Sequence, residues 1–183
     1  MTRYRLQATL RVDPRVRDGG QKIADGRHRI FLACAIIDEV EIVQLGPGDA
    51  DKVIAAGDLF DEQPILDATA RFLDEPGHHL LFAYEGDVPV GFISGVETVH
   101  PDKGTEMFLY EMGVAESHRR HGVGRALIDR LATIARDAGC YGMWVGTEAT
   151  NIAALAAYEA SGAVRDQEPT VILTWKFGPG TQR

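Results

Sequence analysis

The stretch MFLYEMGVAESHRRHGVGRALID, residues 107–129, decides how this sequence is interpreted. Its first part has the apolar residues of a β-strand, and its last part begins the apolar face of a helix. Between them, residues 119–124 (RRHGVG) would direct successive backbone N–H groups, the positive end of the helix and two arginines toward one point. Because Gly122 and Gly124 lack a Cβ atom, phosphate oxygens could approach the main chain there. The stretch therefore predicts a pyrophosphate-binding turn.

Several kinds of phosphate-binding turn place a glycine loop between a strand and a helix. A P-loop needs Lys followed by Ser or Thr where this chain has Arg125-Ala126, and a dinucleotide-binding fingerprint needs a small residue where Leu127 stands. A third pattern, Arg/Gln-x-x-Gly-x-Gly/Ala after a strand, is matched in full by Arg119, Gly122 and Gly124. The remaining alternative is a strand–helix turn that binds nothing.

The length and composition of the chain limit its class. With 183 residues, of which 45% are hydrophobic, it fits one globular domain that can bury a core. Cys34 and Cys140 are far apart and have no Cys/His cluster near them, so we expect no disulfide framework and no metal site. The longest apolar run, Ile30–Ile37, is too short to cross a bilayer. We expect a cytoplasmic protein with no membrane partner.

Charge is distributed unevenly along the chain. Residues 1–40 have eight basic and five acidic residues, the remainder has eleven basic and twenty-two acidic residues, and the net charge is −8. An acidic body repels nucleic-acid backbones, so no nucleic-acid partner is expected. It attracts cationic small molecules such as polyamines or amino sugars. The alternative is that this charge only keeps the protein soluble.

Hydrophobic periodicity and turn residues predict one domain of alternating strands and helices. Residues 1–40 are expected to form a poorly defined extension, with one strand in the apolar run named above, and residues 41–183 the domain. Gly86-Asp87 is a favoured hairpin turn, and Asp49 and Asn151 are expected helix caps. This order of elements indicates an α/β (α+β) sheet protein. Strands are expected at residues 41–45, 79–85, 88–99, 105–114, 141–147 and 171–177, and helices at 50–57, 65–74, 123–137 and 152–160.

From Glu41 to Phe177 the sequence resembles the GNAT superfamily of N-acetyltransferases, whose pyrophosphate loop has the third pattern described above. Within it, the chain is most similar to the aminoglycoside 3-N-acetyltransferases. The resemblance implies a mixed, mostly antiparallel sheet with helices on both faces and a splay after Val114, where the pantetheine arm of acetyl-CoA inserts. The narrower similarity is carried by residues 44–47 (QLGP), 58–60 (DLF), 108–114 (FLYEMGV) and 117–120 (SHRR).

The same resemblance implies which residues bind acetyl-CoA, the expected cofactor. The backbone at the strand end would bond to the pantetheine, with the Val114 N–H polarising the acetyl carbonyl. The glycine turn would hold the pyrophosphate. The predicted cofactor-binding residues are Met112, Gly113, Val114, Arg119, Arg120, His121, Gly122, Val123, Gly124, Arg125 and Asn151.

Two residues are predicted to be catalytic. Glu111 stands where similar enzymes have Asp, which implies a general base that takes a proton from the substrate ammonium, directly or through water. The alternative is an exposed glutamate, although a lone carboxylate between apolar Tyr110 and Met112 is unfavourable. Tyr158 is implied as the general acid for the leaving thiolate, and the alternative is a tyrosine that only packs. With no His–carboxylate signature beside Cys140, we expect direct transfer in a ternary complex.

The acceptor is predicted to be a cationic small-molecule amine. The leading prediction is an aminoglycoside acetylated on its 3-amino group, an antibiotic-resistance activity, with Glu148, Glu106 and Asp61 as substrate-binding residues. The apolar run Val171–Phe177 differs from the acid-rich last strand of similar enzymes and would suit a homodimer interface. Two alternatives stay open. One is a GNAT enzyme for another amine (a polyamine, an amino acid or a protein N-terminus), and the other is a non-catalytic protein that binds acyl-CoA or a drug.

Overall fold

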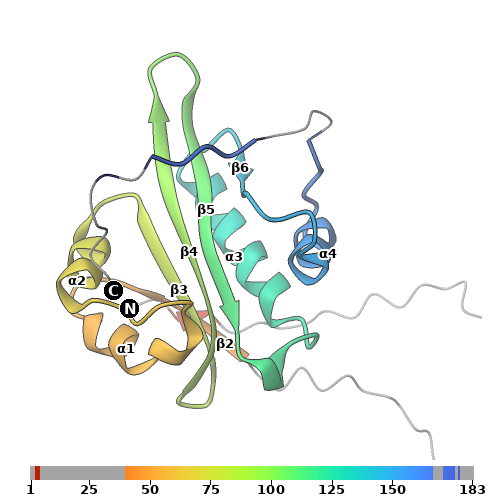
Figure 1. The fold of residues 1–183 in the computed structure, drawn as a ribbon. Helices are drawn as coiled ribbons and strands as arrows, with labels where there is room; N and C mark the ends of the chain where they lie inside the picture. The colour runs from red at the N-terminus through yellow and green to blue at the C-terminus, as the bar shows by residue number, and fades with distance from the viewer. Residues whose placement is uncertain (1–2, 5–39, 167–170, 176, 178–183) are drawn as a thin grey trace, which may run out of the picture.

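The computed structural model describes residues 3–4, 40–166, 171–175 and 177, so the strand predicted at Ile30–Ile37 lies outside the described residues. One six-stranded sheet runs through the domain in the order β1-β2-β3-β4-β5-β6 (Figure 1). Neighbouring strands are antiparallel, except that β5 and β6 are parallel. The strands are β1 (Arg3–Tyr4), β2 (Val40–Leu45), β3 (His78–Glu85), β4 (Val88–His100), β5 (Gly104–Val114) and β6 (Met143–Trp144).

Helices cover both faces of this sheet, as predicted (Figure 1). Two short helices, α1 and α2, lie on one face, and α3, with α4 beside it, lies on the other. The helices are α1 (Ala50–Ala55), α2 (Leu66–Asp74), α3 (Val123–Asp137) and α4 (Ile152–Ala160), with 3-10 helices η1 (Gly57–Leu59) and η2 (Glu116–His118). Within the described ranges, no helix combines the length and the apolar character needed to cross a membrane.

Alternation along the central strands produces a separate core on each face of the sheet. On β3, Leu81 packs in the α3 core while Phe82 packs in the core under α1 and α2, and on β4 Ile93 and Phe92 divide in the same way. All four side chains are fully buried. Each contributes about 1.5–3 kcal/mol of burial free energy. A slip of one residue would move every one of them to the wrong core, so the two cores fix the strand register.

Local turn and cap signals are mostly confirmed. Gly86, with φ 59°, begins the two-residue turn between β3 and β4. Asn151 caps α4, because its Oδ1 accepts a 3.2 Å hydrogen bond from the Ala154 N–H. Asp49 is the N-cap residue of α1, as predicted, but its side chain makes no capping bond. Its carboxylate accepts bonds from the Gly46 N–H (3.1 Å) and Lys52 Nζ (2.7 Å), so it closes the preceding turn.

Two predicted strands differ from the structure. The strand expected at residues 141–147 is reduced to Met143–Trp144, between Gly142 and Gly146, which weaken a strand. Residues 171–175 and 177, expected as a last strand, have no regular secondary structure and are exposed. Their apolar sequence favours a strand, but the two-residue β6 offers no edge long enough for pairing.

Candidate active site

A β-bulge in β5 determines where Glu111 points. On β4, Ser94 pairs with Glu111 but the next residue, Gly95, pairs with Leu109, so Tyr110 is an extra residue without a partner on β4. Before the bulge, Leu109 lies in the α3 core. The extra residue reverses the alternation, so that Glu111 lies on the face covered by α1 and α2.

The loop after η1 is held over this face by an aromatic anchor. Phe60 stacks on Phe92 with ring centroids 3.9 Å apart, and its ring lies 6.2 Å from that of Phe82. The backbone N–H of the next residue, Asp61, donates a long hydrogen bond of 3.5 Å to Oε1 of Glu111. The anchored loop thereby closes one side of a pocket on the sheet.

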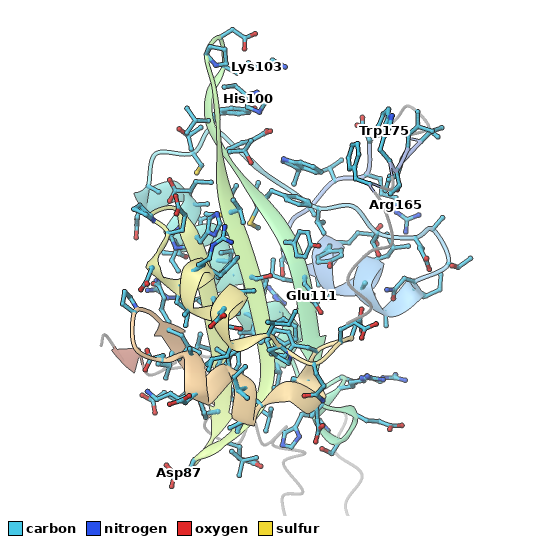
Figure 2. All side chains as sticks on the ribbon, turned by 60° about the vertical axis from the view of Figure 1, so that its left-hand side comes forward. Asp87, His100, Lys103, Glu111, Arg165 and Trp175 are labelled. Atoms are coloured by element: carbon cyan, nitrogen blue, oxygen red, sulfur yellow. The ribbon has the colours of Figure 1, made fainter. Side chains whose placement is uncertain are left out.

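This pocket has a volume of about 560 Å³ and lies between the sheet, the loop at residues 60–65 and the two short helices. Three carboxylates, those of Asp61, Glu62 and Glu111, belong to its lining. Figure 2 shows Glu111 toward the C-terminal end of β5, well away from the hairpin tip at residues 100–103. The pocket therefore opens beside the C-terminal part of the strand that carries the predicted base.

The environment of Glu111 favours proton uptake. Burial of the carboxyl raises its pKa above the ordinary value, the hydrogen bond from the Asp61 N–H lowers it, and the negative charge of Asp61 raises it again. The net direction is upward, toward the range in which a carboxylate accepts a proton from an amine more effectively. A half-buried carboxylate with a raised pKa in a pocket is the arrangement expected of a general base.

Beyond its short pairing with β6, β5 has an open edge. Only Met107 and Phe108 pair with β6 in the described part of the chain, and the Met107 N–H donates a 2.9 Å bond to the Gly142 carbonyl. Backbone groups of alternate residues point to the same side of a strand, and the bulge adds one residue. The N–H and C=O groups of Met112 and Val114 therefore face the open edge, which is the predicted splay.

Gly113 allows η1 to cross close over the end of β5. A Cβ atom at this position would lie 2.5 Å from the Leu59 carbonyl oxygen and 2.6 Å from the ring of Phe92. Both neighbours belong to the backbone or the core, so neither can move away easily. Gly113, predicted as a cofactor contact, thus has a packing role as well.

Replacing Gly113 with alanine is expected to lower the free energy of unfolding by about 1–3 kcal/mol, because the added methyl group overpacks this contact. At about 2–4 °C per kcal/mol for a chain of this size, thermal denaturation should show a clear fall in Tm. Gly142→Ala is the matched control, since nothing lies within 4 Å of a Cβ there. Equal Tm values for the two variants would contradict the close approach.

The turn that precedes α3 has the backbone geometry of an anion site. Arg120 (φ 66°) and Gly122 (φ 86°) are both left-handed, and Gly122 is the N-cap of α3. A non-glycine residue in this conformation is strained, and such strain is common at binding sites. Val123 is buried in the α3 core and fixes the first helical turn. The first N–H groups of a helix have no partner inside it, so this turn can hold a phosphate or pyrophosphate.

The predicted cofactor-binding side chains in this turn have different surroundings. Nε of Arg119 donates a 3.0 Å hydrogen bond to the main-chain oxygen of Val114, which ties the turn to the end of β5. Arg125 forms a 3.5 Å ion pair with Asp129, exposed and therefore worth little. Arg120-His121 is exposed at the tip of the turn. Arg119 thus positions the loop, and Arg120-His121 is open to a ligand.

Gly124, in the first turn of α3, faces the end of β5. A Cβ atom on Gly124 would lie 3.7 Å from Sδ and Cε of Met112 and 3.7 Å from Cγ2 of Val114, which is ordinary van der Waals contact. The end of β5 and the turn at residues 119–124 therefore adjoin each other.

The two predicted catalytic residues lie on opposite faces of the sheet. Tyr158 on α4 is 9% exposed and belongs to the core on the α3 side. Burial raises the pKa of its phenol, so the group holds its proton at neutral pH and is a weaker acid than an exposed tyrosine. Glu111 lies on the side of α1 and α2. Asn151, the cap of α4, is on the Tyr158 side, and its Oδ1 is already used by the helix.

Of the predicted substrate-binding residues, Asp61 lines the pocket and the other two do not. Glu106 accepts hydrogen bonds from the Tyr141 hydroxyl (2.6 Å) and His100 Nε2 (3.1 Å), so it ties β5 to the segment before β6. The bond from Tyr141 lowers the pKa of the Glu106 carboxyl. Glu148 is exposed in the loop before α4. The structure therefore does not bring the three carboxylates together.

Other pocket residues were missed by sequence reasoning. Ser94 lies in the pocket floor and is 7% exposed, and Phe72 and Tyr110 form part of the walls. Ser94 interrupts the apolar sequence of β4, and a polar residue at a position expected to be buried could have indicated a site there. Phe72 looks like any apolar helix residue, and nothing local distinguishes it.

Comparison with solved structures supports the fold. Aminoglycoside acetyltransferase meta-AAC0020, from an uncultured soil metagenomic sample, superposes with a TM-score of 0.68 at 18% identity over 75% of this chain and 97% of that one. AAC(6')-Iy, solved with a bisubstrate analog, gives a TM-score of 0.66 at 19% identity over 76% and 99%. At these identities the likeness shows a shared fold.

Sequence comparison identifies the family. N-acetyltransferase 8B of Rattus norvegicus is 24% identical over 114 residues, 62% of this chain and 51% of that protein. The uncharacterized N-acetyltransferase YycN of Bacillus subtilis (strain 168) is 30% identical over 121 residues, 65% of this chain and 74% of that protein. The chain thus spans about half the length of the rat relative. A model of the acetyltransferase (GNAT) family matches residues 51–163, and the chain therefore belongs to that family.

Proposed function

We propose that this protein is an acetyl-CoA-dependent N-acetyltransferase that acetylates a primary amine within a ternary complex. The observation that carries the proposal is the position of Glu111. This half-buried carboxylate lines a pocket on one face of β5, beside an open strand edge that leads into the turn at residues 119–124. The amine would enter from the pocket, and the thioester would lie along the open edge.

The residues around this edge fit acetyl-CoA. The left-handed turn and the first amides of α3 suit its pyrophosphate. The outward-facing backbone groups of Met112 and the N–H of Val114 suit the amides of its pantetheine, while the Val114 carbonyl is bonded to Arg119. When bound, acetyl-CoA supplies an acetyl group activated as a thioester. A large side chain at Gly124 would occupy the space between the turn and the strand, and glycine leaves it free.

The chain's own residues then have separate tasks. Glu111 takes a proton from the ammonium group, which frees the nitrogen lone pair for attack on the acetyl carbon. The Val114 N–H donates a hydrogen bond to the acetyl oxygen as negative charge develops there. As the carbon–sulfur bond breaks, Tyr158 would give its proton to the sulfur. The phenolate would regain a proton from the attacking nitrogen, which loses its second proton as it becomes an amide, and Glu111 would release the first proton to solvent.

Direct transfer is favoured over an acyl-cysteine intermediate. Burial raises the pKa of the Cys140 thiol, and the charges of Glu97 and Glu106 raise it further. A thiol whose pKa is raised holds less of the nucleophilic thiolate at neutral pH. Cys140 therefore lacks the activation that a ping-pong mechanism would need.

The finer prediction, an aminoglycoside acceptor, has partial support. Three carboxylates line the pocket, and solved aminoglycoside acetyltransferases share the fold, one of them in complex with sisomicin. Acetylation at the 3-amino group stays a prediction, and the solved neighbour whose name specifies a position is AAC(6')-Iy. Mass spectrometry and NMR of the product formed from sisomicin would identify the acetylated nitrogen.

The proposed function makes two measurable predictions. Calorimetry should detect binding of acetyl-CoA and of free CoA, and a thiol-release assay with acetyl-CoA and a panel of primary amines should detect turnover. The panel includes sisomicin, spermidine and small monoamines. Binding without turnover on any amine would favour the non-catalytic alternative. Absence of both CoA binding and turnover would overturn the assignment of the turn and of the open edge.

A further inference from the structure

The floor of the pocket is a row of three side chains from adjacent strands. Glu111 pairs with Ser94, and Ser94 pairs with Leu80 on β3, so all three share one face of the sheet. Neighbouring strands are about 4.8 Å apart, so Leu80 lies roughly 10 Å from Glu111. The floor therefore changes from a carboxylate through a hydroxyl to a fully apolar side chain within the length of a small molecule.

The wall above the Leu80 end is mostly apolar. Val53 of α1 lines the pocket and is buried in the same core as Leu80, and Phe72 of α2 lines the pocket and packs at the margin of that core. Ala68 lies one helical turn before Phe72, on the same side of α2, and also lines the pocket. These three side chains would bury a ring or alkyl group, and the Thr69 hydroxyl is the polar side-chain group that α2 adds to the lining.

The charged groups gather at the other end. The Asp61 backbone contacts the Glu111 carboxylate, and Glu62 follows it on the same loop. None of the described residues that line the pocket is Lys, Arg or His. A carboxylate on the substrate would meet three like charges and no cation, which costs several kcal/mol at close range.

We propose that the acceptor is a primary amine carrying one apolar, ring-sized group and no carboxylate. Its ammonium lies at Glu111 near Asp61, and its apolar group lies on Leu80 against Phe72. This inference rests on the proposed function and names the substrate class of the same site. A polycation such as spermidine or sisomicin would place further charge at the Leu80 end, where the lining from α1 and α2 offers the Thr69 hydroxyl and no carboxylate.

Four amines test the proposal in the thiol-release assay. We expect kcat/KM for 2-phenylethylamine to exceed that for spermidine and for sisomicin by at least about tenfold, the ratio that corresponds to 1.4 kcal/mol. Phenylalanine has the same ring and amine with an added carboxylate, and its kcat/KM should be lower by at least about a hundredfold. Equal or faster reaction with spermidine, sisomicin or phenylalanine would overturn the inference.

A single substitution tests the apolar wall. Ala68 is exposed on α2, so Ala68→Glu should leave the fold intact while adding a carboxylate beside the apolar end. We expect KM for 2-phenylethylamine to rise about tenfold with kcat changed less than about twofold, and the preference to shift toward spermidine. Ala70→Glu, on the same helix but outside the pocket lining, should change KM less than about twofold. An unchanged KM in Ala68→Glu would contradict the placement.

Different results would contradict the inferred substrate class and the proposed acetyltransferase function. Turnover with sisomicin or spermidine but not with 2-phenylethylamine would leave the acetyltransferase proposal standing and remove the apolar-amine inference. Turnover with none of the amines, despite acetyl-CoA binding, would remove both.

Discussion

Replacing Glu111 with glutamine is expected to lower kcat by about a hundredfold or more, the range typical for loss of a general base. The affinity for acetyl-CoA should not change, because Glu111 lies on the face of α1 and α2 rather than along the turn before α3. Single-turnover kinetics and calorimetry would measure the two effects separately. Unchanged acetylation would remove Glu111 from the mechanism.

The pH dependence gives a second readout for Glu111. A base must be ionised to accept a proton, and burial raises the pKa of this carboxyl. In the wild-type protein, kcat/KM should therefore rise with pH through a pKa above that of an ordinary glutamate. In Glu111→Gln, the residual activity should not show this rise of kcat/KM with pH. If the rise persists unchanged in the variant, the titration belongs to another group.

In Glu111→Gln, the stability of the fold should not fall even though the activity does. Because the pKa of Glu111 is raised by folding, the ionised carboxylate destabilises the folded state, and this effect is present once the pH is above the folded-state pKa. Glutamine removes that charge and can still accept the bond from the Asp61 N–H. We expect Tm at neutral pH to stay the same or rise. Glu75→Gln, exposed at the end of α2, is the control and should change neither activity nor Tm.

Elements with local signals could be predicted from the sequence. The Gly86-Asp87 turn fixes the hairpin of β3 and β4, and the apolar face beginning at Val123 fixes α3. The turn before α3 could also be located, because its arginines and glycines lie within six residues of the chain, and its binding of phosphate stays a prediction. These signals depend on neighbours within a few residues, which sequence patterns record directly.

Features that depend on distant segments could not be predicted. The bulge at Tyr110 arises from pairing with β4, and without it Glu111 would face α3 instead of the pocket. Glu106 looked like a substrate ligand because it is acidic and near the strand end, yet Tyr141 from a later segment binds it. The last apolar run was assigned to a strand by composition, although a strand also needs an edge to pair with.

Substituting Gly124 separates cofactor binding from folding. A Cβ atom here makes only ordinary contacts of 3.7 Å with Met112 and Val114, and the backbone of Gly124 is helical and not left-handed. Alanine is therefore compatible with the fold. It should even raise the free energy of unfolding by a few tenths to about 1 kcal/mol, because the unfolded chain loses conformational freedom.

Binding of acetyl-CoA should fall along the series glycine, alanine, valine. The added carbons extend from the first turn of α3 toward Met112 and Val114 at the end of β5, beside the turn that would hold the pyrophosphate. We expect the Kd to rise about threefold to tenfold for Gly124→Ala and about a hundredfold or more for Gly124→Val, while thermal denaturation shows folded proteins.

A change on the solvent side of the same helix is the control for Gly124. Asp129→Ala removes only an exposed ion pair with Arg125 and should leave the Kd within about twofold. In Gly124→Ala we expect a higher free energy of unfolding together with weaker acetyl-CoA binding. General damage to the protein would lower both stability and affinity. An unaltered Kd in Gly124→Val would show that the cofactor does not bind beside the first turn of α3, and the roles assigned to Glu111 and Tyr158 would lose their basis.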